Sequence, residues 1–419
     1  MNRTIRVAAA VTFAALALAA CGGGSSSGTG DGGKELVVST DLPLQGASKD
    51  ASDSTNKAIQ LYLDQQGGKA GAYKITLKPY DDSTAAKGSW DDATCAKNAQ
   101  DHVANTAEVA VMGTYNSGCA KIIAPVLNQD PSGPMLMVSH ANTNPGLTKT
   151  WDPGEPQKYF PTGKRSYARV ITTDDYQGAA AAIYAKETLK ATKVYILNDN
   201  QTYGQGVAKA FESKAKEIGL TVLGNEPWDA KQANYTALFN KIKAGSPDLV
   251  YIGGIYDNNG GQLVKDKVSV LGDNTAVKMI APDGFTGYPE LQKLPQGQGM
   301  YLSFAGLSND QLRAAGGAAA KLLDDYKAKY GADPSTSFAL YGVAATQVIL
   351  AAIEASDGTR AGVTNAVFSG AGITIPADKS AIGKEIKIDP ATGDTTAIDI
   401  SILQIKDDKE TFVFAQPVS

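Results

Sequence analysis

Two polar loops carry the side chains in this sequence that are best suited to binding chemistry. The first, "GTYNSGCAK", contains Ser117, and the second, "MVSHANTNPGLT", contains Thr143. Each loop follows an apolar stretch and leads into a predicted helix, whose free N–H groups and positive dipole end attract an anion. Together with the two hydroxyls, this pattern favours a carboxylate held without a formal positive charge. The alternative is that both hydroxyls only cap helices.

Asp283 offers the opposite charge at the end of another apolar stretch, in "APDG". An ammonium group requires an anionic partner and oxygen acceptors, and Asp283 can supply the anion. The alternative is a turn-forming aspartate before Gly284.

The same residues give little support for catalysis. Ser139 and His140 are adjacent in the sequence, whereas a catalytic serine and histidine are usually far apart, and the chain contains no G-x-S-x-G elbow. The stretch "TYGQGVAK" resembles a dinucleotide loop, but Lys209 stands where the third glycine is needed. We therefore expect no enzyme activity, no catalytic residues and no cofactor, and His140 is expected to shape its loop or touch the ligand.

The N-terminal residues have the pattern of an export signal. Arg3 and Arg6 precede an apolar run at residues 7–20, which is short for a membrane span. Residues 18–21, Leu-Ala-Ala-Cys, resemble the bacterial lipobox, which predicts a signal peptide at residues 1–20 and a lipid on Cys21. The Gly/Ser-rich residues 21–34 then form a flexible linker. The alternative is an ordinary signal peptide with a coincidental cysteine.

The chain has three cysteines, and two of them remain after Cys21 is assigned. Cys95 and Cys119 would lie in an exported, oxidising setting, where a disulfide is expected. Two cysteines are too few for a zinc site without further ligands, so we expect no metal.

Composition limits the remaining classes of protein. The chain has 419 residues, 20% charged residues and a formal net charge of −4, with its basic residues scattered. This length suits two or three domains, and the scattered charge argues against nucleic acid as a partner.

Predicted strands and helices alternate along most of the chain, in two series that meet near residues 169–173. This alternation is typical of parallel sheets flanked by helices, and two series predict two α/β lobes. Two long helices are expected at residues 309–331 and 338–356, and strands joined by turns from residue 373 onward. Residues 150–167 contain three prolines and must form a long loop, which either packs on the surface or rims a cleft.

An ordered set of short motifs extends from residue 36 to about residue 418. The set resembles the Leu/Ile/Val-binding type of periplasmic binding proteins, which are solute receptors of ABC importers. The motifs are "DLPLQG", "LDQQGG", "YDDS", "GTYNSGCAK", "MVSHANTNPGLT", "DDYQG", "NDNQTYGQGVAKAF", "PDLVYIGGIYDNNGGQL" and "APDG".

The resemblance implies the type I periplasmic-binding-protein fold, with two α/β lobes, three crossovers and a ligand between the lobes. It places the N-terminal lobe at residues 36–172 and 302–384, and the C-terminal lobe at residues 173–301 and 385–419. Positions matching Ser117, Ala141 and Thr143 hold the α-carboxylate and part of the α-ammonium in that family. Asp283 matches the acidic partner of the ammonium, and Tyr203 matches a tyrosine that contacts the ligand from the second lobe.

Four further residues are weaker candidates for ligand contact. Tyr115 and Asn116 precede Ser117 and either line the pocket or pack behind it. Ile255 stands where the family often has an aromatic residue, which shifts the contact to Tyr256 or removes it. Phe338 matches a pocket residue of the family, with core packing as the alternative.

The segment "GASKDASDSTNKA" departs most from the family, because it is short and lacks the aromatic that often covers an aliphatic ligand. If its polar side chains face the cleft, the pocket is more polar than a leucine site, and otherwise they are solvated turn and cap residues. The polar side chains in question are Ser48, Lys49, Asp50 and Asp53.

The resemblance also implies partners and a location. We expect a monomer that is exported, anchored outside the cytoplasmic membrane only through its lipid, and that delivers an amino acid to permease and ATPase subunits. The alternatives are a sensor of the same fold, or a receptor for amides, urea or another small polar solute.

Overall fold

The computed structural model describes residues 34–417. The predicted signal peptide, the lipidation at Cys21 and nearly all of the predicted linker therefore lie outside the described residues. Among the residues that are described, no helix combines the length and the apolar character that crossing a membrane requires.

The first lobe is built on a six-stranded sheet in the order β2-β3-β1-β6-β7-β8. All neighbouring pairs are parallel except β2 with β3. Strands β6 and β7 are buried along their whole length, as expected for a parallel sheet covered on both faces. Its strands are β1 (Glu35–Leu42), β2 (Lys69–Ala70), β3 (Tyr73–Asp81), β6 (Glu108–Gly113), β7 (Leu136–Ser139) and β8 (Tyr167–Arg169).

The second lobe is built on a seven-stranded sheet in the order β10-β9-β11-β12-β13-β16-β17. The pairs from β10 to β13 are parallel, and β16 and β17 add an antiparallel edge. Its strands are β9 (Lys193–Asn198), β10 (Thr221–Pro227), β11 (Leu249–Gly253), β12 (Lys278–Ala281), β13 (Tyr301–Phe304), β16 (Ser401–Lys406) and β17 (Lys409–Ala415).

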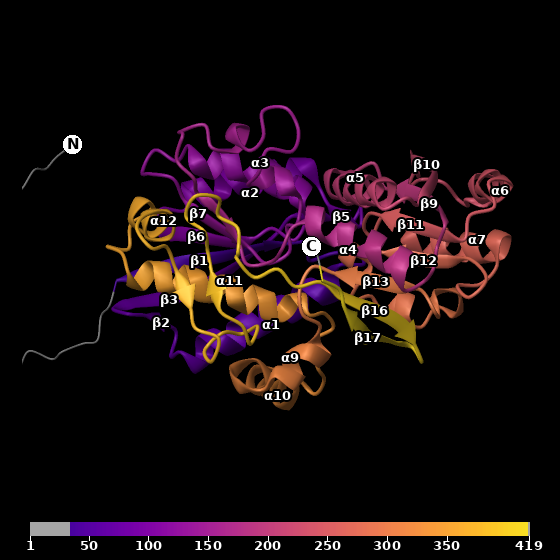
Figure 1. Ribbon diagram of the computed structural model, residues 1–419. Helices are drawn as coiled ribbons and strands as arrows, with labels where there is room; N and C mark the ends of the chain where they lie inside the picture. The colour runs from indigo at the N-terminus through magenta and orange to yellow at the C-terminus, as the bar shows by residue number, and fades with distance from the viewer. Residues whose placement is uncertain (1–33, 418–419) are drawn as a thin grey trace, which may run out of the picture. The chain divides into compact units, whose positions relative to one another are not determined.

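The chain passes between the two sheets three times: after β8, after β13 and before β16. Helices α11 (Phe338–Glu354) and α12 (Arg360–Phe368) return to pack on β6 and β7 of the first lobe. Figure 1 shows these late helices, in orange, beside the early strands, in indigo and purple. The structure thus confirms the predicted α/β architecture of mostly parallel sheets flanked by helices, while the exact residue boundaries of the lobes stay a prediction.

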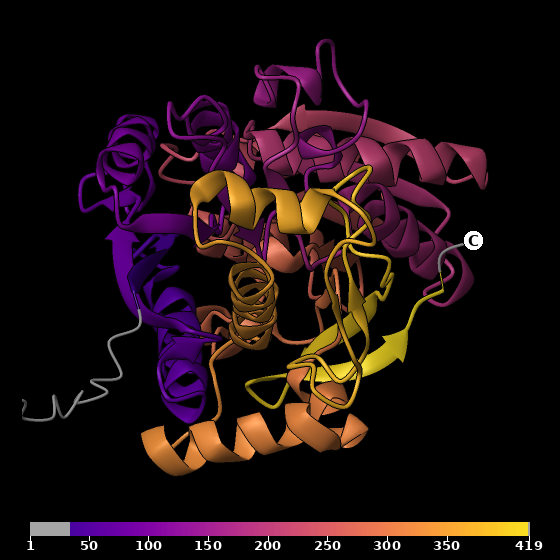
Figure 2. The same cartoon turned by 90° about the vertical axis from the view of Figure 1, so that its left-hand side faces the viewer.

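The other helices of the first lobe are α1 (Lys49–Gln65), α2 (Asp92–Ala104), α3 (Ser117–Asn128) and α10 (Gly317–Tyr330). Helix α10 packs along α1, and Figure 2 shows it, in orange, near the indigo part of the chain. Helix α4 (Asp174–Glu187) follows the first crossover and packs against α5. The helices that follow the strands of the second lobe are α5 (Thr202–Glu217), α6 (Thr236–Ala244), α7 (Gly260–Leu271), α8 (Pro289–Gln292) and α9 (Asn309–Ala315).

Short elements complete the connections. They are the hairpins β4 (Ser83–Thr84) with β5 (Ser89–Trp90) and β14 (Thr374–Ile375) with β15 (Ile386–Lys387), and the 3-10 turns η1 (Pro145–Leu147), η2 (Gln157–Tyr159), η3 (Asp283–Phe285) and η4 (Pro295–Gly297).

The prediction of one continuous helix is wrong in one place. The segment predicted as a single helix at residues 309–331 forms α9 and α10, which are separated at Gly316. Gly316 and Gly317 have φ values of +71° and +62°, a backbone conformation that cannot continue a right-handed helix. The spacing of the apolar residues continues across this point, so the break comes from the two glycines and not from a change in that spacing.

Candidate functional site

A small cavity lies where loops from both lobes meet. Its volume is about 20 Å³, which is room for roughly one water molecule. Of the nine residues expected to contact a ligand, all except Thr143 and Tyr256 line it. The lining residues are Tyr115, Asn116, Ser117, Ala141, Tyr203, Ile255, Asp283, Gly284 and Phe338.

The first wall is the start of α3, where the chain leaves β6. Asn116 is the N-cap residue, but its side chain does not cap the helix. The Ser117 hydroxyl lies at the cavity and accepts a hydrogen bond of 3.3 Å from the backbone N–H of Asn144. The first N–H groups of α3 and this hydroxyl therefore remain available for an anion.

A disulfide between Cys95 and Cys119 fixes this helix start. It joins α2 to the first turn of α3, with a Cα–Cα distance of 5.6 Å, and confirms the predicted pairing. Gly113, which ends β6, has a φ of +156°, and a Cβ atom there would lie 2.8 Å from the Asp41 carbonyl oxygen. Only glycine fits where the strand turns into the loop.

The second loop is tied to the first by Ser139, at the end of β7. The Ser139 hydroxyl donates to the Thr114 carbonyl at 3.0 Å, and it accepts from the N–H groups of Ala141 and Asn142 at 3.1 and 2.8 Å. The Asn142 amide also donates to the Thr114 and Tyr115 carbonyls, at 2.8 and 3.1 Å. These hydrogen bonds join the two loops into one connected unit.

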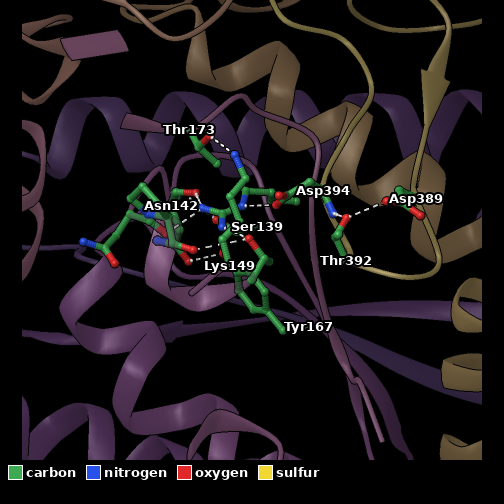
Figure 3. Close-up of polar contacts among 12 residues, drawn as sticks. Ser139, Asn142, Lys149, Tyr167, Thr173, Asp389, Thr392 and Asp394 are labelled. Atoms are coloured by element: carbon green, nitrogen blue, oxygen red, sulfur yellow. Dashed lines mark hydrogen bonds and ion pairs between the residues drawn. The ribbon is translucent and has the colours of Figure 1, made fainter. Parts of the chain in front are cut away.

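Arg169 supports the same loop from beneath. Its guanidinium donates to the carbonyls of Asn142 and Asn144 at 2.8 and 2.9 Å, and pairs with Asp394 at 2.8 Å. Figure 3 shows how this network continues from Asn142 and Tyr167 to Asp394, Thr392 and Asp389. A segment of the third passage between the sheets thus braces the binding loop of the first lobe.

His140 has no catalytic arrangement. Its ring is fully buried against Tyr115 and Phe338, with centroid distances of 5.8 and 6.1 Å, and neither ring nitrogen has a hydrogen-bond partner within residues 34–417. Burial lowers the pKa of His140 to about 3, so the ring is neutral. The Ser139 hydroxyl is engaged by the backbone instead, so Ser139 and His140 do not form a hydrogen-bonded pair.

The second lobe brings Tyr203 and Asp283 together, although 80 positions separate them. Tyr203 lies in the first turn of α5, and its hydroxyl donates to the Asp283 carboxylate and accepts from the Gly284 N–H at 3.1 Å. The other Asp283 oxygen accepts from the Ala305 N–H at 3.3 Å. Burial raises the pKa of Asp283 to about 6, because these hydrogen bonds only partly offset desolvation.

Asp174 is a residue that the sequence patterns did not single out. It is fully buried at the start of α4, and neither of its carboxylate oxygens has a hydrogen-bond partner in the described part of the chain. Burial, and then the negative charge of Asp283, raise the pKa of Asp174 well above its usual value. Its position in "TTDDYQG" is typical of a helix-capping acid, which is why the local pattern hides it.

Thr143 lies beside Asp174, set back from the cavity. The Asp174 N–H donates to the Thr143 carbonyl at 2.9 Å, and the Thr143 hydroxyl is buried without a partner among residues 34–417. These unpaired polar atoms carry a desolvation cost that a ligand reaching them would relieve.

The apolar wall consists of Ile255 and Phe338. Ile255 lines the cavity, whereas Tyr256 lies behind it and packs against Tyr288 and Phe285 at 4.7 and 5.9 Å between centroids. Phe338 sits in an edge-on contact with Tyr115 at 5.2 Å. Ile255 therefore lines the cavity and Tyr256 does not, while contact of either residue with a ligand stays a prediction.

Residues 46–58 of the first lobe, the segment that differs most from the family pattern, contact the second lobe through Ser48. Its N–H and hydroxyl donate to the two carboxylate oxygens of Asp257 at 3.0 and 2.8 Å, and the Tyr288 hydroxyl donates to Asp257 at 2.7 Å. Lys49 pairs instead with Asp53 along the exposed face of α1. Asp50 is exposed at the start of the same helix.

The cavity lining includes residues of the two loops that follow β6 and β7, and the carboxylate of Asp283. It includes no Lys, Arg or His. A carboxylate fits the α3 start, and an ammonium fits Asp283. One cluster of potential metal ligands, Asp82 with Cys95 and Cys119, does not suit a metal, because its two sulfurs are joined in the disulfide. The arrangement can bind a zwitterion.

Comparisons with known proteins agree with this geometry. The sequence model of a family described as periplasmic binding protein matches residues 41–410. The chain is 27% identical over 374 residues to a Leu/Ile/Val-binding protein of Rhizobium johnstonii, which covers 88% of this chain and 91% of the relative. It is 25% identical to a leucine-, isoleucine-, valine-, threonine- and alanine-binding protein of Pseudomonas aeruginosa, over 63% of this chain and 65% of the relative.

Solved structures share the fold. A leucine-binding protein from Thermotoga maritima superposes with a TM-score of 0.75 at 22% identity, over 91% of this chain and 98% of that chain. A solute-binding protein of an ABC transporter from Rhodopseudomonas palustris, in complex with p-hydroxybenzoic acid, gives a TM-score of 0.74 at 18% identity, over 92% and 98%.

Proposed function

The chain belongs to the periplasmic binding protein family, and from this we propose that it is the extracytoplasmic solute-binding subunit of an ABC importer and that its cavity binds an α-amino acid. One observation carries the choice of ligand. The free helix start with Ser117 and the carboxylate of Asp283 face the same cavity from different lobes. An α-amino acid presents a carboxylate and an ammonium at adjoining positions and so complements both.

The mechanism we propose is closure of the two lobes around the solute. The cavity of about 20 Å³ is too small for any amino acid, so the lobes must separate for entry and close less tightly around the ligand. The solute first meets the braced loops of the first lobe, which hold its carboxylate. Closure then brings Asp283 and Tyr203 to its ammonium, and the loaded form is recognised by the permease.

An aromatic acid is the principal competing ligand, because a solved structure of this fold holds p-hydroxybenzoic acid. Such a ligand has a carboxylate but no ammonium. It would leave the ionised carboxylate of Asp283 buried without a cationic partner, which is unfavourable. The buried carboxylate of Asp283 therefore favours an amino acid.

A thermal-shift and calorimetry panel tests this proposal on the purified protein. It should include amino acids, p-hydroxybenzoate, small amides and urea. A ligand at 100 times its Kd stabilises the native state by about 2.7 kcal/mol, which is readily detected. Binding of an amino acid, with loss of binding in Asp283→Ala, is the expected result; binding of p-hydroxybenzoate or urea alone would refute it.

We also propose a lipid anchor at Cys21, on the basis of the lipobox-like residues 18–21. The protein is expected to partition into detergent, and Cys21→Ser is expected to release or mislocalise it. An unchanged membrane fraction for this variant would contradict the anchor.

A further inference from the structure

The cavity has polar groups that neither end of a bare amino acid uses. Once the carboxylate is assigned to Ser117 and the ammonium to Asp283, the lining side chains that remain include Tyr115 and Asn116. These two face whatever the solute carries beyond its α-carbon, together with the apolar Ile255 and Phe338.

The Tyr115 hydroxyl is a desolvated donor. Tyr115 is 5% exposed, and its hydroxyl has no hydrogen-bond partner among the residues that the structure describes. The ring lies against His140 and Phe338, with centroid distances of 5.8 and 5.2 Å. Burial, and then the nearby charge of Asp257, raise the pKa of Tyr115 well above its usual value, so the hydroxyl keeps its proton.

Asn116 places an amide at the same cavity. It is 7% exposed, and its side chain does not cap α3. A carboxamide has two donors and an acceptor of two lone pairs. Two neighbouring residues thus offer both a donor and an acceptor, and an aliphatic side chain could satisfy neither.

The surrounding charges favour a neutral partner. Asp257 lies beyond Tyr115, and both of its oxygens already accept hydrogen bonds from Ser48 and Tyr288. Three neutral donors thus already occupy most of its acceptor positions. An acidic side chain would face Asp257 and Asp283 without any Lys, Arg or His in the lining.

We infer that the site selects an α-amino acid whose side chain ends in a neutral hydrogen-bonding group, a hydroxyl or a carboxamide, over branched aliphatic amino acids. This inference rests on the proposed function. Tyr115 and Asn116 bind the polar end, and Ile255 and Phe338 cover the side-chain carbons. A site built to hydrogen-bond a substrate group rejects analogues that lack it, because its own buried groups are then left unpaired.

Calorimetry on the purified protein tests the inference with serine, threonine, asparagine and glutamine against leucine, isoleucine and valine. Alanine is the reference, because it has the same α-groups and no polar end. The best polar ligand is expected to bind at least about tenfold more tightly than alanine and the aliphatic ligands. Leucine, isoleucine or valine binding more tightly than every polar ligand would overturn the inference and leave the proposed function standing.

Two variants assign the preference to residues. Tyr115→Phe removes only the hydroxyl and is expected to weaken binding of the best polar ligand about tenfold, with less than a twofold effect on alanine. Asn116→Ala is expected to act in the same direction. Tyr184→Phe is the matched control, since Tyr184 is 3% exposed and packs against Tyr301 in the second lobe, away from the cavity lining. If both Tyr115→Phe and Asn116→Ala keep the wild-type preference for polar ligands, the inference is also overturned. If neither alanine nor any other amino acid binds, the proposed function itself is refuted.

Discussion

Ser48 and Asp257 hold the two lobes together although 209 positions separate them. The Ser48 N–H and hydroxyl donate to different oxygens of the same carboxylate, at 3.0 and 2.8 Å. Tyr288 completes the contact, because its hydroxyl lies 3.1 Å from the Ser48 hydroxyl and donates to Asp257. Separation of the lobes, which any solute requires, must therefore break these hydrogen bonds.

Ser48→Ala should shift the free protein toward the open form. The substitution removes one of these hydrogen bonds, worth about 1 kcal/mol, which corresponds to roughly a fivefold change in the ratio of open to closed molecules. Small-angle X-ray scattering should show a larger radius of gyration without ligand. Lys49→Ala is the control, because Lys49 pairs only along the surface of α1; equal expansion in both variants would argue against the contact.

Asp283→Asn should weaken amino-acid binding at least 100-fold without destabilising the empty protein. An ammonium that is buried without its counter-charge loses about 3 kcal/mol or more. The empty protein, in contrast, loses a charged carboxylate that burial disfavours, which is why the pKa of Asp283 is raised. Calorimetric titration and scanning calorimetry separate the two effects, and a large fall in melting temperature would indicate a structural role instead.

Binding should weaken as the pH falls below 6. Burial raises the pKa of Asp283 to about 6 in the free protein, and an ammonium binds only its ionised form. Below that pKa a proton must leave on binding, so affinity should fall toward tenfold per pH unit, and above about pH 7 it should level off. Titrations between pH 5 and pH 7.5 measure this slope, which should disappear in Asp283→Asn.

His102 should make stability depend on alkaline pH. Its ring is buried between two carboxylates: Nε2 lies 3.0 Å from Oδ2 of Asp41, and Nδ1 contacts Glu108. Burial alone would lower the pKa of His102, but the hydrogen bonds to these two carboxylates raise it from the ordinary 6.5 to about 9. The raised pKa of His102 means that its protonated form stabilises the fold. This contribution to the unfolding free energy is fully present below about pH 6.5 and is lost as the pH rises through 9. Urea unfolding should show a loss of up to about 3 kcal/mol over that window. Glu108→Gln should reduce the dependence, because it removes one of the two charges.

Loss of the disulfide should cost both stability and affinity. Cys95 and Cys119 are 24 positions apart, and closing a loop of that length stabilises a fold by about 3 kcal/mol. Cys95→Ser with Cys119→Ser should lower the unfolding free energy by this amount and weaken amino-acid binding, because the start of α3 carries Ser117. Thiol reagents should fail to label the native protein before reduction, and labelling without reduction would contradict the pairing in solution.

The α/β architecture and much of the cavity lining could be predicted from the sequence. Ser117, Tyr203 and Asp283 each follow an apolar strand, and parallel strands place the loops after them at one edge of a sheet. Their meeting at one cavity follows from that rule and from the family resemblance. The cysteine pair followed from composition and export.

Other features needed the tertiary structure. The choice between Ile255 and Tyr256 depends on a shift of one residue after β11, and such a shift turns a side chain to the opposite side. Asp174 resembles a helix-capping acid in the sequence, and only its position in three dimensions makes it a buried neighbour of Asp283. The Ser48–Asp257 contact leaves no local pattern at all, because both residues are ordinary loop and cap residues in their own segments.

The sequence by itself thus determined which segments fold into sheets and which loops end at their carboxyl edges, because backbone periodicity is a local property. Only the tertiary structure decided which polar groups are left unpaired inside the closed cleft. Tyr115 and Asp174 are polar in any context, but the cost and the use of their unpaired atoms arise from burial by distant segments of residues 34–417. Phe338, for example, lies against Tyr115 although more than half of the chain separates them.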